Sequence, residues 1–325
     1  MAEVFLATEA MATRFELYLI GSDPARLRAV GEEALAEIRQ LDRLLSRFRP
    51  DSDIGRINAA KAGEKVRVDG RTFRLLQEAI AISQKTEGAF DISVGPLLRC
   101  WGIAHQRDRL PSVKEREKAR LLVGPHHLQL DQRTLTVEKD ADQVQVDLGA
   151  IGKGYALDRA VQILLDQGMT SFFLHGGTSS AIGWGEREKG QPWTVALGNQ
   201  SNGNEEPITL ALNNVALSVS TPLGRFSTLT PNGKPSRRGR LIGHTIDPRT
   251  GLPVKGPTLS AVLSPSATVA DALSTAALIA HTNELHRWVA VFPKEIILIC
   301  HKGRWKRFAG SVPQRGFSIP SALRQ

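Results

Sequence analysis

The sequence predicts an α+β fold in which long helices and short strands mix irregularly. Two observations support this class. Apolar residues recur at helical spacing in several long segments, and short alternating or continuous apolar runs crowd the second half of the chain. This irregular order favours α+β over a regular βαβ array. Because no linker rich in Pro, Gly or Ser divides the sequence cleanly, we interpret residues 1–325 as a single catalytic unit.

The first half of the chain contains a strand followed by helices. FELYLIG (15–21) alternates and ends at Gly, which predicts a strand. Residues 25–46 carry apolar side chains every three or four positions and predict an amphipathic helix. RPDSDIGRIN (49–58) is rich in turn formers and predicts a loop. A second helix is expected over 71–88, closed by Gly, and a charged helix over 113–122.

The second half is richer in strands. Short apolar runs predict strands over 135–140, 144–149, 171–177, 194–198, 210–220, 288–293 and 295–301. Residues 152–168 again show helical spacing and end at Gly, which predicts a third amphipathic helix. Residues 269–282 are almost wholly apolar, and we expect a helix that is buried on all sides.

Composition excludes several classes of protein. The chain has a net charge of +9, but its basic residues are dispersed and are not interleaved with aromatics, so no nucleic-acid partner is expected. Cys100 and Cys300 are far apart, which excludes a disulfide framework. Acidic residues interrupt the N-terminal segment, and every apolar run falls short of the about 20 residues that span a bilayer. We therefore expect a soluble, cytoplasmic protein without a membrane span.

The segment VQVDLGAIGKGYALD (144–158) is the first whose residues suggest a functional site. Asp147 ends an apolar run, small residues follow, and Lys153 stands at the opening of a helix. Small residues let a ligand approach the backbone, and free N–H groups at a helix start favour an anion. Lys153 adds a point charge suited to phosphate. The pattern is neither a Walker A loop nor a dinucleotide fingerprint, so an anion site and an ordinary turn both remain open.

A second cluster lies on the apolar helix. Asp271, Ser274 and Thr275 are spaced i, i+3 and i+4, which places three oxygens on one helix face. An unpaired buried carboxylate is costly, and a hard cation such as magnesium is one physical solution. The alternative is an acid that interacts only with the positive end of the helix dipole.

Two further segments have less specific patterns. LIGHTIDPRTGLPV (241–254) contains turn chemistry, with His244 three residues before Asp247; His244 is either a pocket residue or a core histidine. GAFDISVGPLLRCWG (88–102) combines an acid, two glycines, a proline and a tryptophan. It is either a pocket wall for a flat ring or a loop packed by Trp101.

Taken together and in order, seven segments resemble the ApbE-like family of FAD:protein FMN transferases. The resemblance covers almost the whole chain, and the shared order makes it specific although each piece is short. The segments are MATRFELYLIG (11–21), LSRFRPDSDIGRIN (45–58), GAFDISVGPLLRCWG (88–102), VDLGAIGKGYALDRA (146–160), LHGGTSS (174–180), HTIDPRTGLPV (244–254) and ADALSTA (270–276).

The resemblance implies a fold and an activity. Such proteins have an α+β architecture that is a variant of the T-fold, with mixed or antiparallel sheets and packed helices. They bind FAD with a divalent cation, usually Mg²⁺, cleave its pyrophosphate and attach FMN to a Thr or Ser hydroxyl of a target protein, while AMP leaves. The implied partners are FAD and a flavin-acceptor redox protein. Some relatives mainly hydrolyse FAD to FMN and AMP.

The resemblance also implies site residues. Asp271, Thr275 and the carbonyl of Ala150 match the metal positions, with Ser274 where some relatives have an acid. Asp147 and Lys153 match positions that contact FAD beside the metal. The flavin side is matched by the following residues: Met11, Ala89, Phe90, Asp91, Phe48, Thr245 (where Ile is usual) and His244. Either Asp247 or His244 is a candidate general base.

Two segments depart from the family pattern. SVSTPLGRFS (218–227) lacks the usual acid and tyrosine, and LHGGTSS has Leu174 and Thr178 at positions that are usually polar. Two rival functions therefore stay open beside the transferase. One is an FAD pyrophosphatase that hands FMN to water, and the other is a flavin-binding homologue without turnover.

Overall fold

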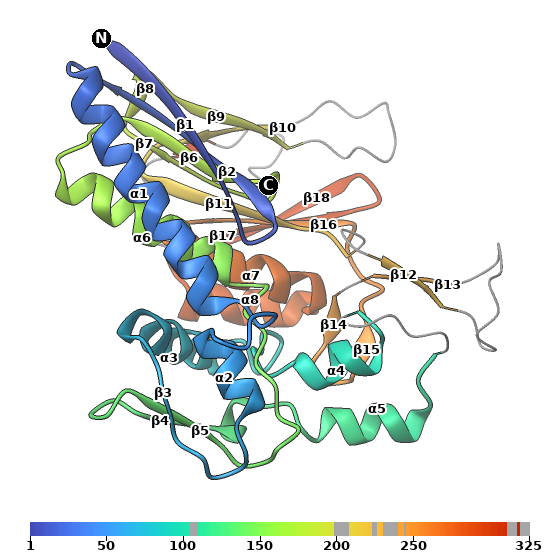
Figure 1. Ribbon diagram of the computed structural model, residues 1–325. Coiled ribbons are helices and arrows are strands. Elements are labelled where there is room, and N and C mark those ends of the chain that lie inside the picture. The colour runs from blue at the N-terminus through green and yellow to red at the C-terminus, as the bar shows by residue number, and fades with distance from the viewer. Residues whose placement is uncertain are drawn as a thin grey trace.

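Eight antiparallel strands form the central sheet of the structure, a computed structural model that describes residues 1–103, 110–197, 208–222, 226–229, 240–243, 245–310 and 317–318 (Figure 1). From one edge to the other the strands are β1 (Ala2–Ala10), β2 (Thr13–Gly21), β6 (Phe172–Gly176), β7 (Ser180–Trp184), β11 (Val215–Ser220), β16 (Leu259–Ser264), β17 (Ile296–His301) and β18 (Arg304–Ala309). The chain leaves this sheet after β2, β11 and β16, and each excursion contributes residues to the candidate site.

Helices cover one face of the central sheet. The long α1 (Pro24–Leu45), α6 (Gly152–Asp166) and α7 (Ala267–Ile279) pack against one another and against the strands (Figure 1). Their apolar residues and those of the strands form one large buried core. Helix α7 is buried nearly all round because it lies between α6 and strands β11 and β16, which explains its almost wholly apolar sequence.

A second sheet covers part of the opposite face. It contains β19 (Phe317–Ser318), β10 (Ile208–Leu212), β9 (Gln191–Leu197) and β8 (Glu186–Glu188). Trp193 and Leu212 from this sheet pack with Leu217 and Leu263 of the central sheet in a separate apolar cluster. Strand β16 is buried on both faces, so its sequence is a continuous rather than an alternating apolar run.

Most of the remaining elements lie in the lower part of Figure 1. They are α2 (Asp53–Ala59), β3 (Val66–Arg67), α3 (Gly70–Lys85), α4 (Gly95–Cys100), α5 (Val113–Arg120), the 3₁₀ turn η1 (Pro125–His127), β4 (Leu128–Asp131), β5 (Thr136–Lys139), β14 (Ile246–Asp247) and β15 (Leu252–Pro253). Helix α8 (Thr282–Val291) instead lies beside α7 and contacts β18. A two-stranded ribbon, β12 (Phe226–Leu229) with β13 (Arg240–Gly243), completes the described elements.

The predicted α+β class and the five predicted helices are confirmed, whereas two local predictions are wrong and one strand was missed. Residues 49–58 are not all loop, because the Ser52 side chain caps α2 by accepting a hydrogen bond from the Gly55 N–H. Residues 288–293 are not a strand, because most of them continue α8. Sequence analysis also missed β1, which pairs along its whole length with β2.

The predicted strand 144–149 is also wrong, and its partner explains why. The side chain of Asn58 donates to the Val146 carbonyl at 2.9 Å and accepts from the Val146 N–H at 2.7 Å, so it occupies the groups that a neighbouring strand would use. Beside it, the buried Lys139 ammonium donates to the carbonyls of Asn58, Asp142 and Val144 at 3.0, 2.9 and 3.1 Å. These side chains and backbone pairing limited, among the described residues, to a single bridge between Val94 and Gln145 hold the segment, so it does not join a sheet.

Candidate functional site

The candidate site lies where α6 begins against the first turns of α7. Gly154 makes this approach possible, since a Cβ at that position would lie 2.1 Å from the Ala267 carbonyl oxygen. The Gly154 N–H, one of the free donors at the helix start, donates to Asp271 Oδ2 at 3.0 Å. The two clusters found in the sequence are therefore joined directly.

Asp271 is a buried carboxylate with polar neighbours. The residue is only 3% exposed. Its Oδ1 accepts a hydrogen bond from the Ser218 hydroxyl at 3.1 Å and lies 3.8 Å from the Lys153 ammonium. The negative charge is thus compensated by one nearby cation and two hydrogen-bond donors. The prediction that Asp271 and Lys153 share a site is consistent with this geometry.

Further hydroxyl groups lie beyond Ser218 in a connected cluster. Ser274 donates to the Asp271 backbone carbonyl at 2.9 Å, and its oxygen lies 3.2 Å from that of Ser218. Ser220 lies 2.8 Å from the Ser274 hydroxyl and 3.3 Å from that of Thr275. Sequence reasoning missed Ser218 and Ser220; their i, i+2 spacing on a strand, which puts both on one face, was the available signal.

The donor set fits a hard cation. Within the described residues, no three His, Cys, Asp or Glu side chains gather in a way that could hold a metal ion. A cation beside Asp271 would therefore take hydroxyl and carbonyl oxygens as its other protein ligands. Thr275, Ser274 and the carbonyl of Ala150, in the turn just before α6, are of that kind. Oxygen-only sites with one carboxylate and open positions suit Mg²⁺ rather than zinc.

Asp147 is oriented next to this turn. Its Oδ1 accepts from the Gly149 N–H at 2.7 Å, and its Oδ2 forms an ion pair with the Arg47 guanidinium. The same guanidinium lies over the Phe48 ring, 4.7 Å from its centroid. Phe48 is 72% exposed, so one of its faces is free for a planar ligand. Arg47 was not predicted, and it connects two residues that were.

The predicted flavin wall is built mainly from backbone. The side chains of Ala89 and Phe90 are buried in the main core, and Asp91 accepts hydrogen bonds from the hydroxyls of Ser83 and Ser93. A ligand would therefore meet the main chain of this segment. The Asp147 N–H donates to the carbonyl of Ile92 at 2.7 Å, which ties this segment to the turn before α6.

Met11 lies at another backbone feature. It has a φ of 51°, uncommon for a residue with a side chain, and its N–H donates to Asp42 on α1 at 2.9 Å. Such strained positions persist only where surrounding contacts hold them. The Met11 turn is therefore fixed to α1 rather than free to rearrange.

The turn after His244 is organised by charge pairs. Asp247 accepts from the Arg249 N–H at 2.9 Å and from its guanidinium at 3.1 Å. Arg249 also pairs with Glu284 on α8. Thr245 is buried, and its carbonyl accepts from the Val254 N–H at 3.0 Å. His244 lies outside the described residues.

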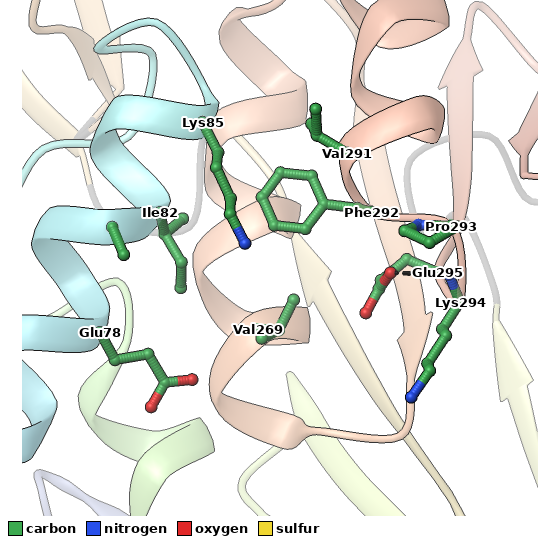
Figure 2. Close-up of a pocket in the computed structure, with 10 residues that line it drawn as sticks. Glu78, Ile82, Lys85, Val269, Val291, Phe292, Pro293, Lys294 and Glu295 are labelled. Carbon is green, nitrogen blue, oxygen red and sulfur yellow. Dashed lines mark hydrogen bonds between the residues drawn. The ribbon is translucent and has the colours of Figure 1, made fainter.

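A separate pocket of about 240 Å³ lies between α3, α7 and the turn before β17 (Figure 2). Ile82, Val269 and Phe292 line it, and Lys85 points its ammonium toward the Phe292 ring at 5.4 Å. It contains none of the residues predicted for the site. Glu78, at its edge, has a pKa raised above the ordinary value by burial and by the nearby charge of Asp158.

Comparison with known proteins identifies relatives over most of the chain. Residues 11–299 match the model of the ApbE family. The FAD:protein FMN transferase of Salmonella typhimurium is 27% identical over 305 residues, covering 92% of this chain and 84% of that protein. The structure of the flavin transferase ApbE from Vibrio cholerae gives a TM-score of 0.79 at 25% identity, covering 95% of this chain and 97% of that one. The ApbE protein from Thermotoga maritima gives a TM-score of 0.78 at 28% identity, with 92% and 94% covered.

Proposed function

The chain belongs to the ApbE family, and from this we propose that it is a magnesium-dependent FAD:protein FMN transferase in which residues 1–325 act as one catalytic unit. The acceptor would be a Thr or Ser hydroxyl of a redox protein. The observation that carries the proposal is the buried Asp271 carboxylate, which meets the start of α6 and Lys153 at 3.8 Å. Relatives named FAD:protein FMN transferase support the choice of reaction.

The reaction is a substitution at the FMN phosphorus. The acceptor oxygen forms a bond to that phosphorus while the bond from it to the bridging oxygen of the pyrophosphate breaks. AMP leaves with the bridging oxygen, and the hydroxyl proton passes to a base. Negative charge grows on the pyrophosphate oxygens, so groups that neutralise it contribute most to catalysis.

The protein offers three kinds of group to that charge. A magnesium ion held by Asp271, Thr275 and the Ala150 carbonyl, with Ser274 close by, would supply positive charge to the pyrophosphate. Lys153 adds a second positive charge from the first turn of α6. The positive end of the α6 dipole also favours an anion at this place.

The flavin and its ribityl chain would lie toward the turn that precedes α6. We assign Met11, the 89–91 backbone and Thr245 to the flavin side, with Phe48 as a ring for stacking. Asp147, held by Arg47, would bind hydroxyl groups of the substrate. These assignments follow the family positions and agree with the short path from Asp147 through Ile92 to the wall.

The base is assigned to either His244 or Asp247. Asp247 forms an ion pair with Arg249, which fixes the turn. A proton taken by either residue would leave the acceptor oxygen free to attack. Separate His244→Ala and Asp247→Asn variants distinguish the two, since loss of the base reduces turnover without weakening FAD binding.

Intact mass spectrometry of a co-expressed flavin-carrier protein tests the proposal. Transfer predicts a mass gain equal to one FMN on the carrier, together with free AMP. Release of free FMN and AMP, with an unmodified carrier, would instead identify an FAD pyrophosphatase. Recovery of intact FAD bound to the chain would show a binding protein without turnover.

A further inference from the structure

Asp158 joins the two helices that carry the candidate site. It lies on α6, one helical turn after Gly154, and faces the start of α7. Its Oδ1 accepts from the Ala267 N–H at 2.8 Å. Its Oδ2 accepts from the Thr268 N–H at 2.9 Å, from the Thr268 hydroxyl at 2.6 Å and from the Ser266 hydroxyl at 2.8 Å.

These four hydrogen bonds place a carboxylate from one helix at the N-terminus of another. Helix α7 already has its own cap, because the Ser266 hydroxyl accepts from the Val269 N–H at 3.2 Å. Asp158 satisfies the N–H groups of Ala267 and Thr268, which that cap leaves unpaired. Its negative charge also lies at the positive end of the α7 dipole.

The contact fixes the place of Asp271 relative to α6. Asp271 lies one turn after Ala267, and its carboxylate accepts from the Gly154 N–H. Helices α6 and α7 are thus attached at two points one turn apart on each helix, Asp158 to Ala267–Thr268 and Gly154 to Asp271. A change at the first point alters where the Asp271 carboxylate lies beside Lys153 and the Ala150 carbonyl.

We propose that Asp158 is a positioning residue that sets the affinity of the Asp271 site for a divalent cation. Asp158 does not touch the proposed substrate or cation; it acts through α7. The inference rests on the proposed function, because that function places a cation at Asp271. Residues that orient metal ligands typically change affinity about 10- to 100-fold when they are replaced.

The test titrates Mn²⁺ into the full chain in the presence of FAD and follows free Mn²⁺ by electron paramagnetic resonance. The variant is Asp158→Asn, which keeps the size of the side chain but replaces one acceptor oxygen with an NH₂ group. The matched control is Asp23→Asn. Asp23 caps α1 by accepting from the N–H groups of Ala25 and Arg26 at 3.0 and 3.1 Å, far from the site along the chain.

Asp158→Asn is expected to raise the Mn²⁺ dissociation constant at least about tenfold, whereas Asp23→Asn leaves it within about twofold of wild type although both variants lose a negative charge at a helix N-terminus. Equal Mn²⁺ affinities for Asp158→Asn and wild type would overturn this inference alone. A wild-type chain that binds no Mn²⁺ with FAD would overturn the proposed function as well. If Asp158→Asn does not fold, Thr268→Val removes one of the four donors, and an affinity unchanged in that variant overturns the inference.

Discussion

The Gly154 N–H donates to the Asp271 carboxylate, and the Gly154 Cα lies so close to α7 that a Cβ would overlap the Ala267 carbonyl at 2.1 Å. Gly154→Ala is therefore expected to force α6 and α7 apart. Overlap with backbone cannot be relieved by a rotamer change, and we expect a loss of about 2 kcal/mol or more of unfolding free energy together with loss of turnover.

Gly70→Ala is the matched control for that change. Gly70 begins α3, and a Cβ there meets nothing within 4 Å. Urea unfolding of both variants should show destabilisation only for Gly154→Ala. Equal stabilities of the two variants would show that α6 and α7 can separate without cost.

Asp271→Asn is expected to keep the fold and lose at least about a hundredfold in turnover, equivalent to about 2.7 kcal/mol of barrier. The amide keeps the shape of the side chain but loses the charge that a cation requires. Turnover of FAD measured against Mg²⁺ concentration checks this, with circular dichroism for the fold. Asp166→Asn, an exposed position later on α6, should behave as wild type, and full activity of Asp271→Asn at limiting Mg²⁺ would rule out the metal assignment.

Lys153→Met is expected to reduce kcat/KM for FAD more than tenfold, which corresponds to more than about 1.4 kcal/mol. In the wild type, the Lys153 ammonium at the start of α6 would neutralise part of the negative charge of the pyrophosphate. Steady-state kinetics at fixed Mg²⁺ measures the effect. Lys118→Met on the surface helix α5 controls for loss of a positive charge in general; if the two variants have equal rates, Lys153 does not contact the substrate.

Lys139→Met is expected to destabilise the fold by about 3 kcal/mol, because three backbone carbonyls lose their only described side-chain donor in a buried setting. Burial disfavours the charged amine and lowers the pKa of Lys139, and the three carbonyls offset part of that cost. Urea unfolding at pH 7 gives the measurement. The exposed Lys65→Met should change stability little, and a similar result for Lys139→Met would mean that water replaces the ammonium.

Glu78→Gln is expected to stabilise the chain at pH 7. The pKa of Glu78 is raised in the folded state by burial and by Asp158, so the folded state holds its proton to a higher pH than the unfolded state does. The contribution of Glu78 to stability therefore falls as the pH rises through its pKa in the unfolded and then in the folded state, and the ionised Glu78 destabilises the fold above both. The advantage of Gln should shrink as the pH falls through the pKa of Glu78, where Glu is neutral too. Urea midpoints at pH 7 and at pH 4.5, with exposed Glu33→Gln as the control, test both the sign and the pH dependence.

Sequence reasoning succeeded where one local pattern decides the structure. The helix periodicity of 25–46 and 152–168 survives tertiary packing, and the i, i+3, i+4 oxygens of the apolar helix lie in one cluster because that geometry is a property of the helix itself. The place of Lys153 at a helix start was likewise predictable, because the helical spacing of the residues that follow it marks where the helix begins.

It failed where a distant side chain replaces a backbone partner. Residues 144–149 have the composition of a strand, but Asn58, 88 residues away from Val146, takes the hydrogen bonds of the missing neighbour. The role of Asp158 was hidden for the same reason, because its four donors lie more than 100 residues later. Ser218 and Ser220 were missed because the polar contacts of their strand are made with α7, which is distant in the sequence.

The 117 residues that separate Gly154 from Asp271 bear on how the protein is made. During synthesis, α6 emerges from the ribosome well before its partner, with the Gly154 N–H and the Asp158 carboxylate unmatched until α7 follows. Contacts of such long sequence separation form late, and they slow folding. A nascent chain ending before Asp271 therefore lacks one side of the proposed site, which can form only when α7 docks on α6.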